Sequence, residues 1–337
     1  MKTNKTKSLK AIKKITSAVV AAVLALCAFT VNAAAAPSEE KTVVVSIEAF
    51  SVGCGYVLEP TLISISDGDT AATAVKKALE ENNIIYNASY EYGFYINSIS
   101  FEHTAAIPDY ITNAVVAHDD EYDEDILFGD YIEEDATPND LASNDYVYGL
   151  SGWMYTINQP TAESLSKGMS QAYVNDGDVI RVQFSLDCGA DIGTANLSGM
   201  PQWGYHADFY ETADKTELTR AIAESTAKAQ SPLSNALKKM KQTAAKLPAT
   251  QAEVDSALSD YNTILALNPI SGDVDRNNKI SIMDAIMIQK AVLSISELSG
   301  VQTLVADCNG DGEVSVLDAI LVQKSALSIQ TTAESNI

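Results

Sequence analysis

Two twelve-residue stretches near the C-terminus carry oxygen-bearing side chains at the spacing of a calcium-binding loop: DVDRNNKISIMD at 273–284 and DCNGDGEVSVLD at 307–318. In such loops positions 1, 3 and 5 supply side-chain oxygens and position 7 its carbonyl, position 9 often acts through water, and position 12 is a bidentate carboxylate. We therefore expect one Ca²⁺ ion in each loop. The predicted ligands are Asp273, Asp275, Asn277, Lys279 (carbonyl), Ser281 and Asp284, then Asp307, Asn309, Asp311, Glu313 (carbonyl), Ser315 and Asp318.

The two loops belong to an internal duplication, because residues 273–295 align with residues 307–329 without a gap. One acidic turn can imitate a calcium loop, but two in register are hard to explain by chance. Position 6 requires a sharp backbone turn and is Gly312 in the second loop but Asn278 in the first. Asn tolerates the left-handed region better than most residues, so the first site is expected to be weaker but present.

The flanks of the loops indicate which kind of calcium protein this is. An apolar helical pattern follows each loop, whereas Asn268-Pro269-Ile270-Ser271-Gly272, before the first loop, cannot be helical through the proline and glycine. The sequence therefore predicts helices that leave the loops and none that enter them. This disfavours a calcium sensor.

A duplicated loop followed by a helix closely resembles the type I dockerin, over residues 270–331. The resemblance implies that two calcium ions fold the segment and that it binds a cohesin module on the scaffoldin of a cellulosome-like, polysaccharide-degrading complex. The cohesin contacts that it implies are Ile282, Met283, Gln289 and Lys290 in the first copy and Val316, Leu317, Gln323 and Lys324 in the second.

Many dockerins carry hydroxyl residues where this chain has the apolar pairs Ile282-Met283 and Val316-Leu317, which leaves the identity of the cohesin open. These pairs could instead be core residues. However, Ile280, Val314 and helix residues such as Leu293 already supply a core, so we expect the pairs to be exposed for a partner. Since the two copies are nearly alike, either is expected to dock after a half-turn.

Residues 41–195 predict one α+β sheet with a helix across it. Strand patterns lie at 42–50, 62–66, 92–101, 152–159 and 175–193, and a helix follows a cap at Asp69 or Thr70. The stretch 118–145, which has ten acids between Asp119 and Asp135, is expected to be a solvated surface insertion, with a metal site as the alternative.

The same segment resembles secreted domains related to the C-terminal domain of transcobalamin, through Gly152-Trp153-Met154-Tyr155, Asn158, Asp176-Gly177-Asp178 and Asp191-Ile192-Gly193. The resemblance implies a β-grasp-like sheet and no settled activity. Cys54 and Cys188 follow the first and last strands, which are neighbours in such folds, so we expect them to form a disulfide.

Between these two segments, residues 213–267 predict three short helices: Asp214 to about Ala227, Pro232 to about Leu247, and Thr250 to about Leu267. They resemble helical spacers of bacterial surface proteins. The expected fold class is therefore modular: an α+β, β-grasp-like domain, a small helical bundle, and an all-α dockerin with paired calcium loop-helix units.

Residues 1–35 have the lysine-rich start, apolar run and small-residue end of a secretory signal peptide. We expect the chain to be secreted and held at a bacterial cell surface through a scaffoldin. Cleavage after Ala33 removes six lysines and no acids, leaving 16 basic and 45 acidic residues, a formal charge of −29. Nucleic acid and membranes are therefore not expected as partners.

Three functions remain open for residues 41–195. Trp153, Tyr155, Trp203 and Tyr205 would suit a binding module that stacks on sugar rings of a polysaccharide or on another flat ligand. The alternative is that Trp153 packs in the sheet and the other three are ordinary linker aromatics. An enzyme is disfavoured, because the three histidines lie in no H-E-x-x-H motif and there is no G-x-S-x-G; a glycoside hydrolase with paired carboxylates is the remaining enzymatic alternative. The third possibility is a structural adaptor.

Overall fold

The computed structural model describes residues 40–119, 140–143, 146, 149–225 and 231–327. The predicted signal peptide and most of the acidic insertion lie outside these residues. The chain divides into Met1–Glu40 and Lys41–Ile337, and apart from Glu40 all described residues belong to the second unit.

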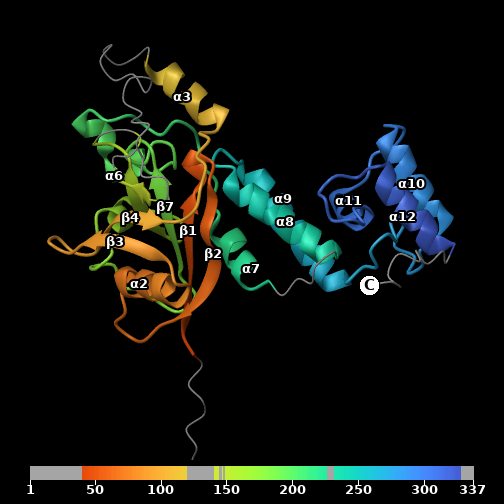
Figure 1. The fold of residues 1–337 in the computed structure, drawn as a ribbon, viewed down its shortest axis with the longest axis horizontal. Helices are drawn as coiled ribbons and strands as arrows, with labels where there is room; N and C mark the ends of the chain where they lie inside the picture. The colour runs from red at the N-terminus through yellow and green to blue at the C-terminus, as the bar shows by residue number, and fades with distance from the viewer. Residues whose placement is uncertain (1–39, 120–139, 144–145, 147–148, 226–230, 328–337) are drawn as a thin grey trace, which may run out of the picture. The chain divides into compact units, whose positions relative to one another are not determined.

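A four-stranded sheet of order β2-β1-β7-β6 organises the N-terminal part (Figure 1). Strand β1 (Thr42–Ala49) pairs antiparallel with β2 (Gly55–Ser64) and parallel with β7 (Val179–Ser185), which pairs antiparallel with β6 (Gly152–Ile157). The first and last strands are thus central neighbours, as expected for folds of the kind that this segment resembles.

Helix α2 (Ala71–Glu81) lies on one face of this sheet. It begins at Thr70, whose side chain accepts a hydrogen bond from the Thr73 N–H at 3.4 Å, which confirms one of the two predicted caps. The core between them includes Val43, Val45, Ile47, Val75, Leu79, Ile180, Val182 and Phe184.

A second, three-stranded sheet has the order β3-β4-β5 and corrects the expectation of a single sheet. Its strands are β3 (Ile85–Ser89), β4 (Tyr95–Ser100) and β5 (Asp140–Ala142). The fully buried Ile96, Ile99 and Leu141 join the core under α2. Among the described residues, these strands pair with one another and not with the four-stranded sheet. Helix α3 (Asp109–Asp119) precedes the undescribed acidic stretch.

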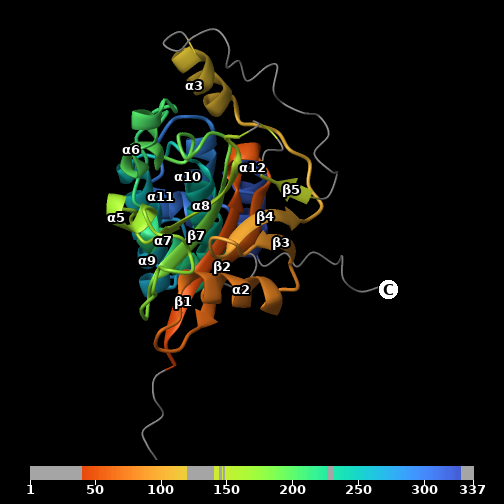
Figure 2. The same cartoon turned by 90° about the vertical axis from the view of Figure 1, so that its left-hand side faces the viewer.

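The opposite face of the four-stranded sheet carries several polar side chains that are buried. Ser46, Glu48, Thr156 and Gln183 are each at most 4% exposed. Helix α7 (Thr216–Ala223) contacts this face, so α2 and α7 lie on opposite sides of the sheet (Figure 2). Short elements border it: η1 (Phe50–Val52), α5 (Ala162–Leu165), α6 (Ala195–Ser198) and η2 (Met200–Trp203).

The three predicted spacer helices are present as α7, α8 (Pro232–Ala245) and α9 (Gln251–Leu267). Ser231 and Thr250 begin α8 and α9 with capping boxes, as the Thr250 pattern predicted. Their shared core also includes Leu304 and Val305, which come from the C-terminal segment. Among the described residues, no helix is long and apolar enough to cross a bilayer.

The C-terminal segment contains α10 (Ile282–Val292), α11 (Gly300–Ala306) and α12 (Val316–Ala326). Helix α11 ends immediately before the second loop, so the expectation that no helix enters either loop is wrong for this copy. It forms because Ser299 caps it and because Leu304 and Val305 are buried against the spacer. Leu293, expected in the core, is 68% exposed.

Candidate functional site

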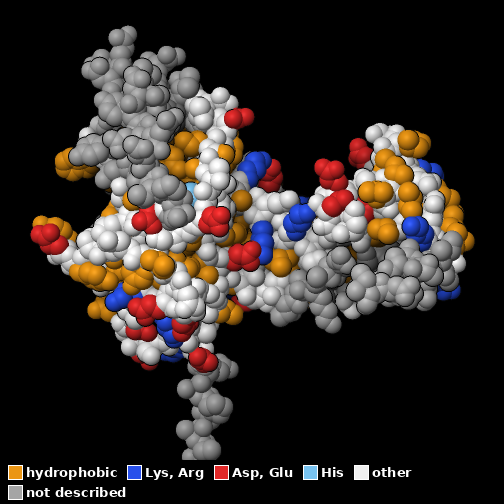
Figure 3. Space-filling view, viewed as in Figure 1, with side chains coloured by type: hydrophobic (Ala, Val, Ile, Leu, Met, Phe, Trp, Pro, Cys, Tyr) orange, Lys and Arg blue, Asp and Glu red, His pale blue; other side chains and the backbone are white. Residues whose placement is uncertain are grey.

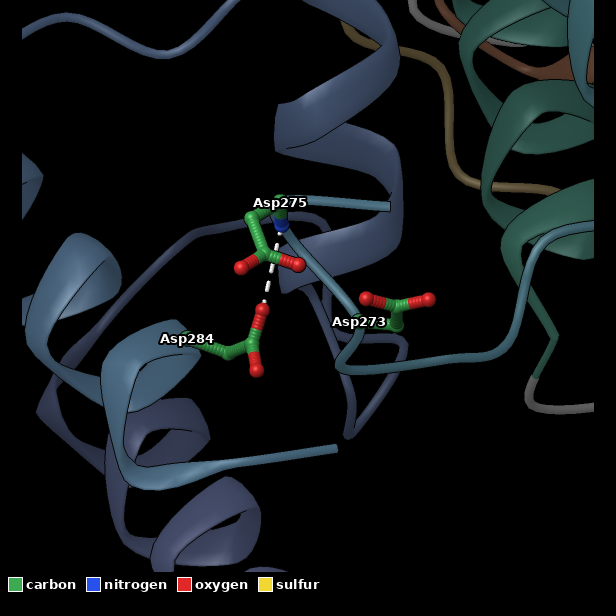
Figure 4. A group of neighbouring side chains, drawn as sticks. All are labelled: Asp273, Asp275 and Asp284. Carbon is green, nitrogen blue, oxygen red and sulfur yellow. Dashed lines mark hydrogen bonds between the residues drawn. The ribbon is translucent and has the colours of Figure 1, made fainter. Parts of the chain in front are cut away.

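The first loop brings three carboxylates together. One oxygen each of Asp273, Asp275 and Asp284 lies within 4.8 Å of the others (Figure 4). Asp273 is 2% exposed and Asp284 is fully buried, while Asp275 is exposed. Gathering carboxylates away from water is costly unless a cation compensates them. An all-oxygen group of this kind suits a hard divalent cation such as Ca²⁺.

The first aspartate of each loop also organises the backbone that follows. Asp273 accepts hydrogen bonds from the N–H groups of Asn277 (3.1 Å) and Asn278 (2.7 Å). In the second loop, Asp307 accepts from Gly310 (2.8 Å) and Gly312 (3.0 Å). In both loops the first aspartate therefore accepts from the N–H of position 6, and from one further N–H, which is at position 5 in the first loop and at position 4 in the second.

Position 6 adopts the left-handed conformation that the sequence predicted. Asn278 has φ of 66° and Gly312 has φ of 98°. In the first loop, Asn278 adopts this left-handed turn at some conformational cost. In the second loop, Gly312 adopts it at almost none.

The closing aspartate of each loop also caps the helix that leaves it. Ser281 is the N-cap of α10, and Asp284, three residues on, accepts from the Ser281 N–H at 2.9 Å and its hydroxyl at 2.8 Å. Ser315 and Asp318 repeat this at 2.9 and 3.0 Å at the start of α12. Asp284 also accepts from the Asp275 N–H at 3.1 Å (Figure 4). One carboxylate thus joins loop and helix.

Two carboxyl groups of the second loop have pKa values shifted in opposite directions. Burial raises the pKa of Asp307, and the hydrogen bond from the Glu313 N–H lowers the pKa of the exposed Asp311. The Asn309 amide donates to Asp311 at 2.6 Å, which orients that carboxylate.

Helix α8 of the spacer contacts the second loop, which sequence reasoning missed. The Asn235 side chain donates to the carbonyls of Leu304 (3.0 Å) and Asp307 (2.7 Å). Lys238 donates to the carbonyls of Gly310 and Asp311. A lone Asn and Lys on a helical pattern carry no signal for such contacts, because both residues are usually solvated on helix surfaces.

Apolar side chains are exposed at the start of each exiting helix. Ile282 and Met283 are 40% and 59% exposed, and Val316 and Leu317 are 53% and 62% exposed. Hydrophobic side chains are visible at the surface around α10 and α12 (Figure 3). The remaining predicted contacts divide by exposure: Lys290 and Lys324 are exposed, while Gln289 and Gln323 are half-buried.

Comparison with known proteins assigns a family to this segment. Residues 271–327 match the type I dockerin domain. The dockerin domain thus spans both loops, α10, α11 and α12, and type I dockerins as a family bind calcium. A solved structure from Acetivibrio cellulolyticus contains the third cohesin ScaC in complex with the ScaB dockerin, mutated in its N-terminal helix, and displays a type I interaction.

The match to that structure has 34% identity and covers 18% of this chain and 84% of the other, with a TM-score of 0.17. No curated protein matches the chain.

The four aromatic residues predicted to bind a ligand do not form one surface. Trp153 is 2% exposed, its indole N–H donates to the Leu141 carbonyl at 3.0 Å, and its ring packs edge-on against Phe184. It is a core residue, because the alternation of side chains along β6 turns it into the buried cluster that includes Leu141 and Phe184. Of the two alternatives for Trp153, packing in the sheet is therefore the one observed, and the expectation that it stacks on a ligand is wrong.

The other three residues differ among themselves. Tyr155 is half-buried, donates to the Lys167 carbonyl at 2.7 Å, and has its pKa raised to about 12 by burial. Trp203 is 80% exposed in η2, and Tyr205 is half-buried. Trp203 alone of the four offers an open ring.

Cys54 and Cys188 are both free thiols, contrary to the predicted disulfide. Strands β1 and β7 are neighbours as expected. The chain, however, turns through η1 before Cys54, whose thiol contacts the Val52 carbonyl at 3.5 Å, and Cys188 sits in a left-handed turn with φ of 42°. Neighbouring strands therefore do not bring the two sulfurs together. Cys308 is also free.

A buried polar network follows β7. His206 Nδ1 lies 2.5 Å from Asp187 Oδ2, and the Ser185 hydroxyl donates to Asp191 at 2.5 Å. Burial raises the pKa of Asp191. Of the motifs noted in the sequence, only Asp191-Ile192-Gly193 includes a residue of this network. Because these groups are buried and bonded to one another, they act to hold the segment after β7 in place.

Proposed function

We propose that this chain is a secreted component of a cellulosome-like, polysaccharide-degrading complex that docks onto a cohesin module of a scaffoldin through its dockerin domain. The observation that carries the proposal is the exposed apolar pair beside the closing aspartate of each loop, within a segment that matches the type I dockerin. On this proposal the chain is extracellular and held at the cell surface by the scaffoldin.

The dockerin domain binds two Ca²⁺ ions, one in each loop. The ligands proposed are the twelve loop residues, with Lys279 and Glu313 acting through their carbonyls. The clustering of Asp273, Asp275 and Asp284 supports the first site. The matching backbone hydrogen bonds around Asp307 support the second. Calcium shapes the loops and thereby fixes the starts of α10 and α12, where the docking residues lie.

The cohesin contacts the pairs Ile282-Met283 or Val316-Leu317, together with Gln289 and Lys290 or Gln323 and Lys324. All four apolar side chains are exposed, so both copies present a similar surface. Each copy can dock after a half-turn of the domain. Spacer contacts to the second loop involve the backbone of Asp307, Gly310 and Asp311 and leave its apolar pair exposed.

Calorimetric titration of the full chain with a panel of cohesins, including the third cohesin of ScaC, tests the proposal. We expect binding in calcium and none in excess chelator. The double variants Ile282→Asp/Met283→Asp and Val316→Asp/Leu317→Asp should each retain most of the affinity for the cohesin. The variant that combines all four substitutions should lose it. Equal binding with and without chelator, or complete loss in one double variant alone, contradicts the proposal.

For residues 41–195 we propose a β-grasp-like domain that serves as a non-catalytic binding module or adaptor. The parallel central pair β1 and β7 with α2 across it supports this fold. An accessory glycoside hydrolase is the alternative. Trp203, which follows this domain in η2, favours binding, because its open ring can stack on a sugar. Pull-down and hydrolysis assays with insoluble polysaccharides separate the cases: retention without products supports a binding module, products support the hydrolase, and neither supports an adaptor.

A further inference from the structure

The polar face of the four-stranded sheet lines a pocket that the docking function does not use. Strands β6 and β7 form one side, and residues 192–197 and 212–216 form the others. Its volume is about 140 Å³. Since a water requires roughly 10–15 Å³ of such space, the pocket has room for on the order of ten waters. That is the size class of a monosaccharide.

Two buried polar side chains line this pocket. Thr156 and Gln183 are each 4% exposed. Among the described residues, neither the Thr156 hydroxyl nor the Gln183 amide has a hydrogen-bond partner. Neither group is among the fully enclosed unpaired atoms, so both face the space of the pocket. Native proteins normally satisfy such groups with protein, water or a ligand. These two side chains are therefore placed to bond a pocket occupant.

Beside them, Arg181 supplies a fixed donor. Its Nε and Nη2 donate to Glu48 at 3.0 and 2.7 Å, and the Ser46 hydroxyl donates to the same carboxylate at 2.7 Å. This bidentate pair neutralises the guanidinium and holds its plane. Among described groups, Nη1 has no partner, and Arg181 lines the pocket. A pre-positioned N–H without net charge favours an oxygen of an uncharged ligand over an anion.

The remaining walls fit the same kind of ligand. Lys215 donates to the Ala244 and Lys246 carbonyls at 3.0 and 2.6 Å, so its amine is already engaged. Burial also lowers its pKa to about 7, so it contributes only part of a positive charge at neutral pH. Apolar contacts come from Ile192, Leu197 and Leu247. Hydroxyl-bearing molecules with C–H faces match a wall of this composition.

We propose that this pocket binds a small, uncharged, polyhydroxylated molecule of monosaccharide size, through the Gln183 amide, the Thr156 hydroxyl and Arg181 Nη1. The site goes beyond cohesin docking and shares no residue with it.

Saturation-transfer NMR and calorimetry on the full calcium-loaded chain test the site, with glucose, xylose, galactose, mannose and arabinose as separate probes. We expect at least one sugar to bind. Gln183→Met and Thr156→Val, which keep side-chain size, should each weaken binding about tenfold, the effect of about 1.4 kcal/mol. Thr156→Ser should retain it, and so should the exposed matched control Gln171→Met.

Two readouts make the outcome decisive. Unchanged melting temperatures and unchanged cohesin affinity in the pocket variants exclude misfolding and separate this site from the docking function. The proposal is overturned if no sugar binds at concentrations on the order of ten millimolar. It is equally overturned if binding survives Gln183→Met and Thr156→Val but is lost in Trp203→Ala, because the sugar would then stack on the surface.

Discussion

The side-chain amide of Asn235, in α8, donates to the carbonyl of Asp307, the first residue of the second calcium loop, at 2.7 Å. Asn235 is only 6% exposed and donates from the same nitrogen to the Leu304 carbonyl at 3.0 Å. The spacer therefore stabilises one of the two loops directly. Stability of the dockerin domain and packing of the spacer are coupled at this residue.

Asn235→Ala should lower the free energy of unfolding by about 1–3 kcal/mol, because two buried carbonyls lose their donor. Urea unfolding in saturating calcium, followed by circular dichroism, measures the change. Asn262→Ala, at an exposed position of α9, is the control and should stay within about 0.5 kcal/mol of the wild type. Equal losses of unfolding free energy in the two variants would contradict the proposed coupling between spacer and loop.

Asp284→Asn and Asp318→Asn should each weaken calcium binding at their own loop by tenfold or more, about 1.4 kcal/mol. Asn keeps an oxygen for the helix cap but loses the charge and the bidentate carboxylate. Calorimetric calcium titration resolves the two sites, and the exposed Asp255→Asn serves as the charge-matched control. Unaltered affinity and stoichiometry in both loop variants would show that these aspartates are not ligands.

Position 6 should respond oppositely in the two loops. Asn278→Gly should tighten calcium binding slightly, because glycine adopts the observed φ of 66° at lower cost. Gly312→Ala should destabilise the domain by about 1–3 kcal/mol, because alanine is strained at φ of 98°. Calcium-dependent melting temperatures measure both, and changes of the same sign would contradict the left-handed geometry.

The two tryptophans should separate core from surface. Trp153→Ala should cost about 3–5 kcal/mol, as for other large buried side chains. Trp203→Ala, at an 80% exposed position, should change stability by no more than about 0.5 kcal/mol. Urea denaturation of the two single variants decides this, and a small loss at Trp153 would return it to the candidate ligand-binding residues.

Lys215 should make stability rise with pH. Burial lowers its pKa to about 7, whereas an exposed lysine titrates near 10.4. Between these values the unfolded chain binds more protons, so the free energy of unfolding increases with pH, by up to about 1.4 kcal/mol per unit. Below pH 7 the amine is protonated in both states and contributes no slope.

The measurement is the difference in free energy of unfolding between the wild type and Lys215→Met at pH 7, 8 and 9, which isolates this group from the tyrosines and thiols that titrate higher. The difference should grow with pH. The exposed Lys167→Met should give a flat difference. A flat result for Lys215→Met as well would mean that its amine is not desolvated.

Features that depend on local chemistry or on the duplication were predictable from the sequence. The Thr70 cap, the left-handed Asn278 and Gly312, and the exposed apolar pairs follow from side-chain type and spacing. Because of the duplication, each loop position can be compared between two copies, and agreement between the copies supports the assignment.

Features that depend on distant packing were decided only by the tertiary structure. Trp153 proved to be core, Cys54 and Cys188 remained apart, and Leu304 and Val305 drew α11 into the spacer core. The pocket beside Gln183 likewise arises only where β7 meets residues 192–197 and 212–216. A sequence pattern reports what a residue prefers within its own helix, strand or loop, whereas burial and partners depend on which distant elements pack against it.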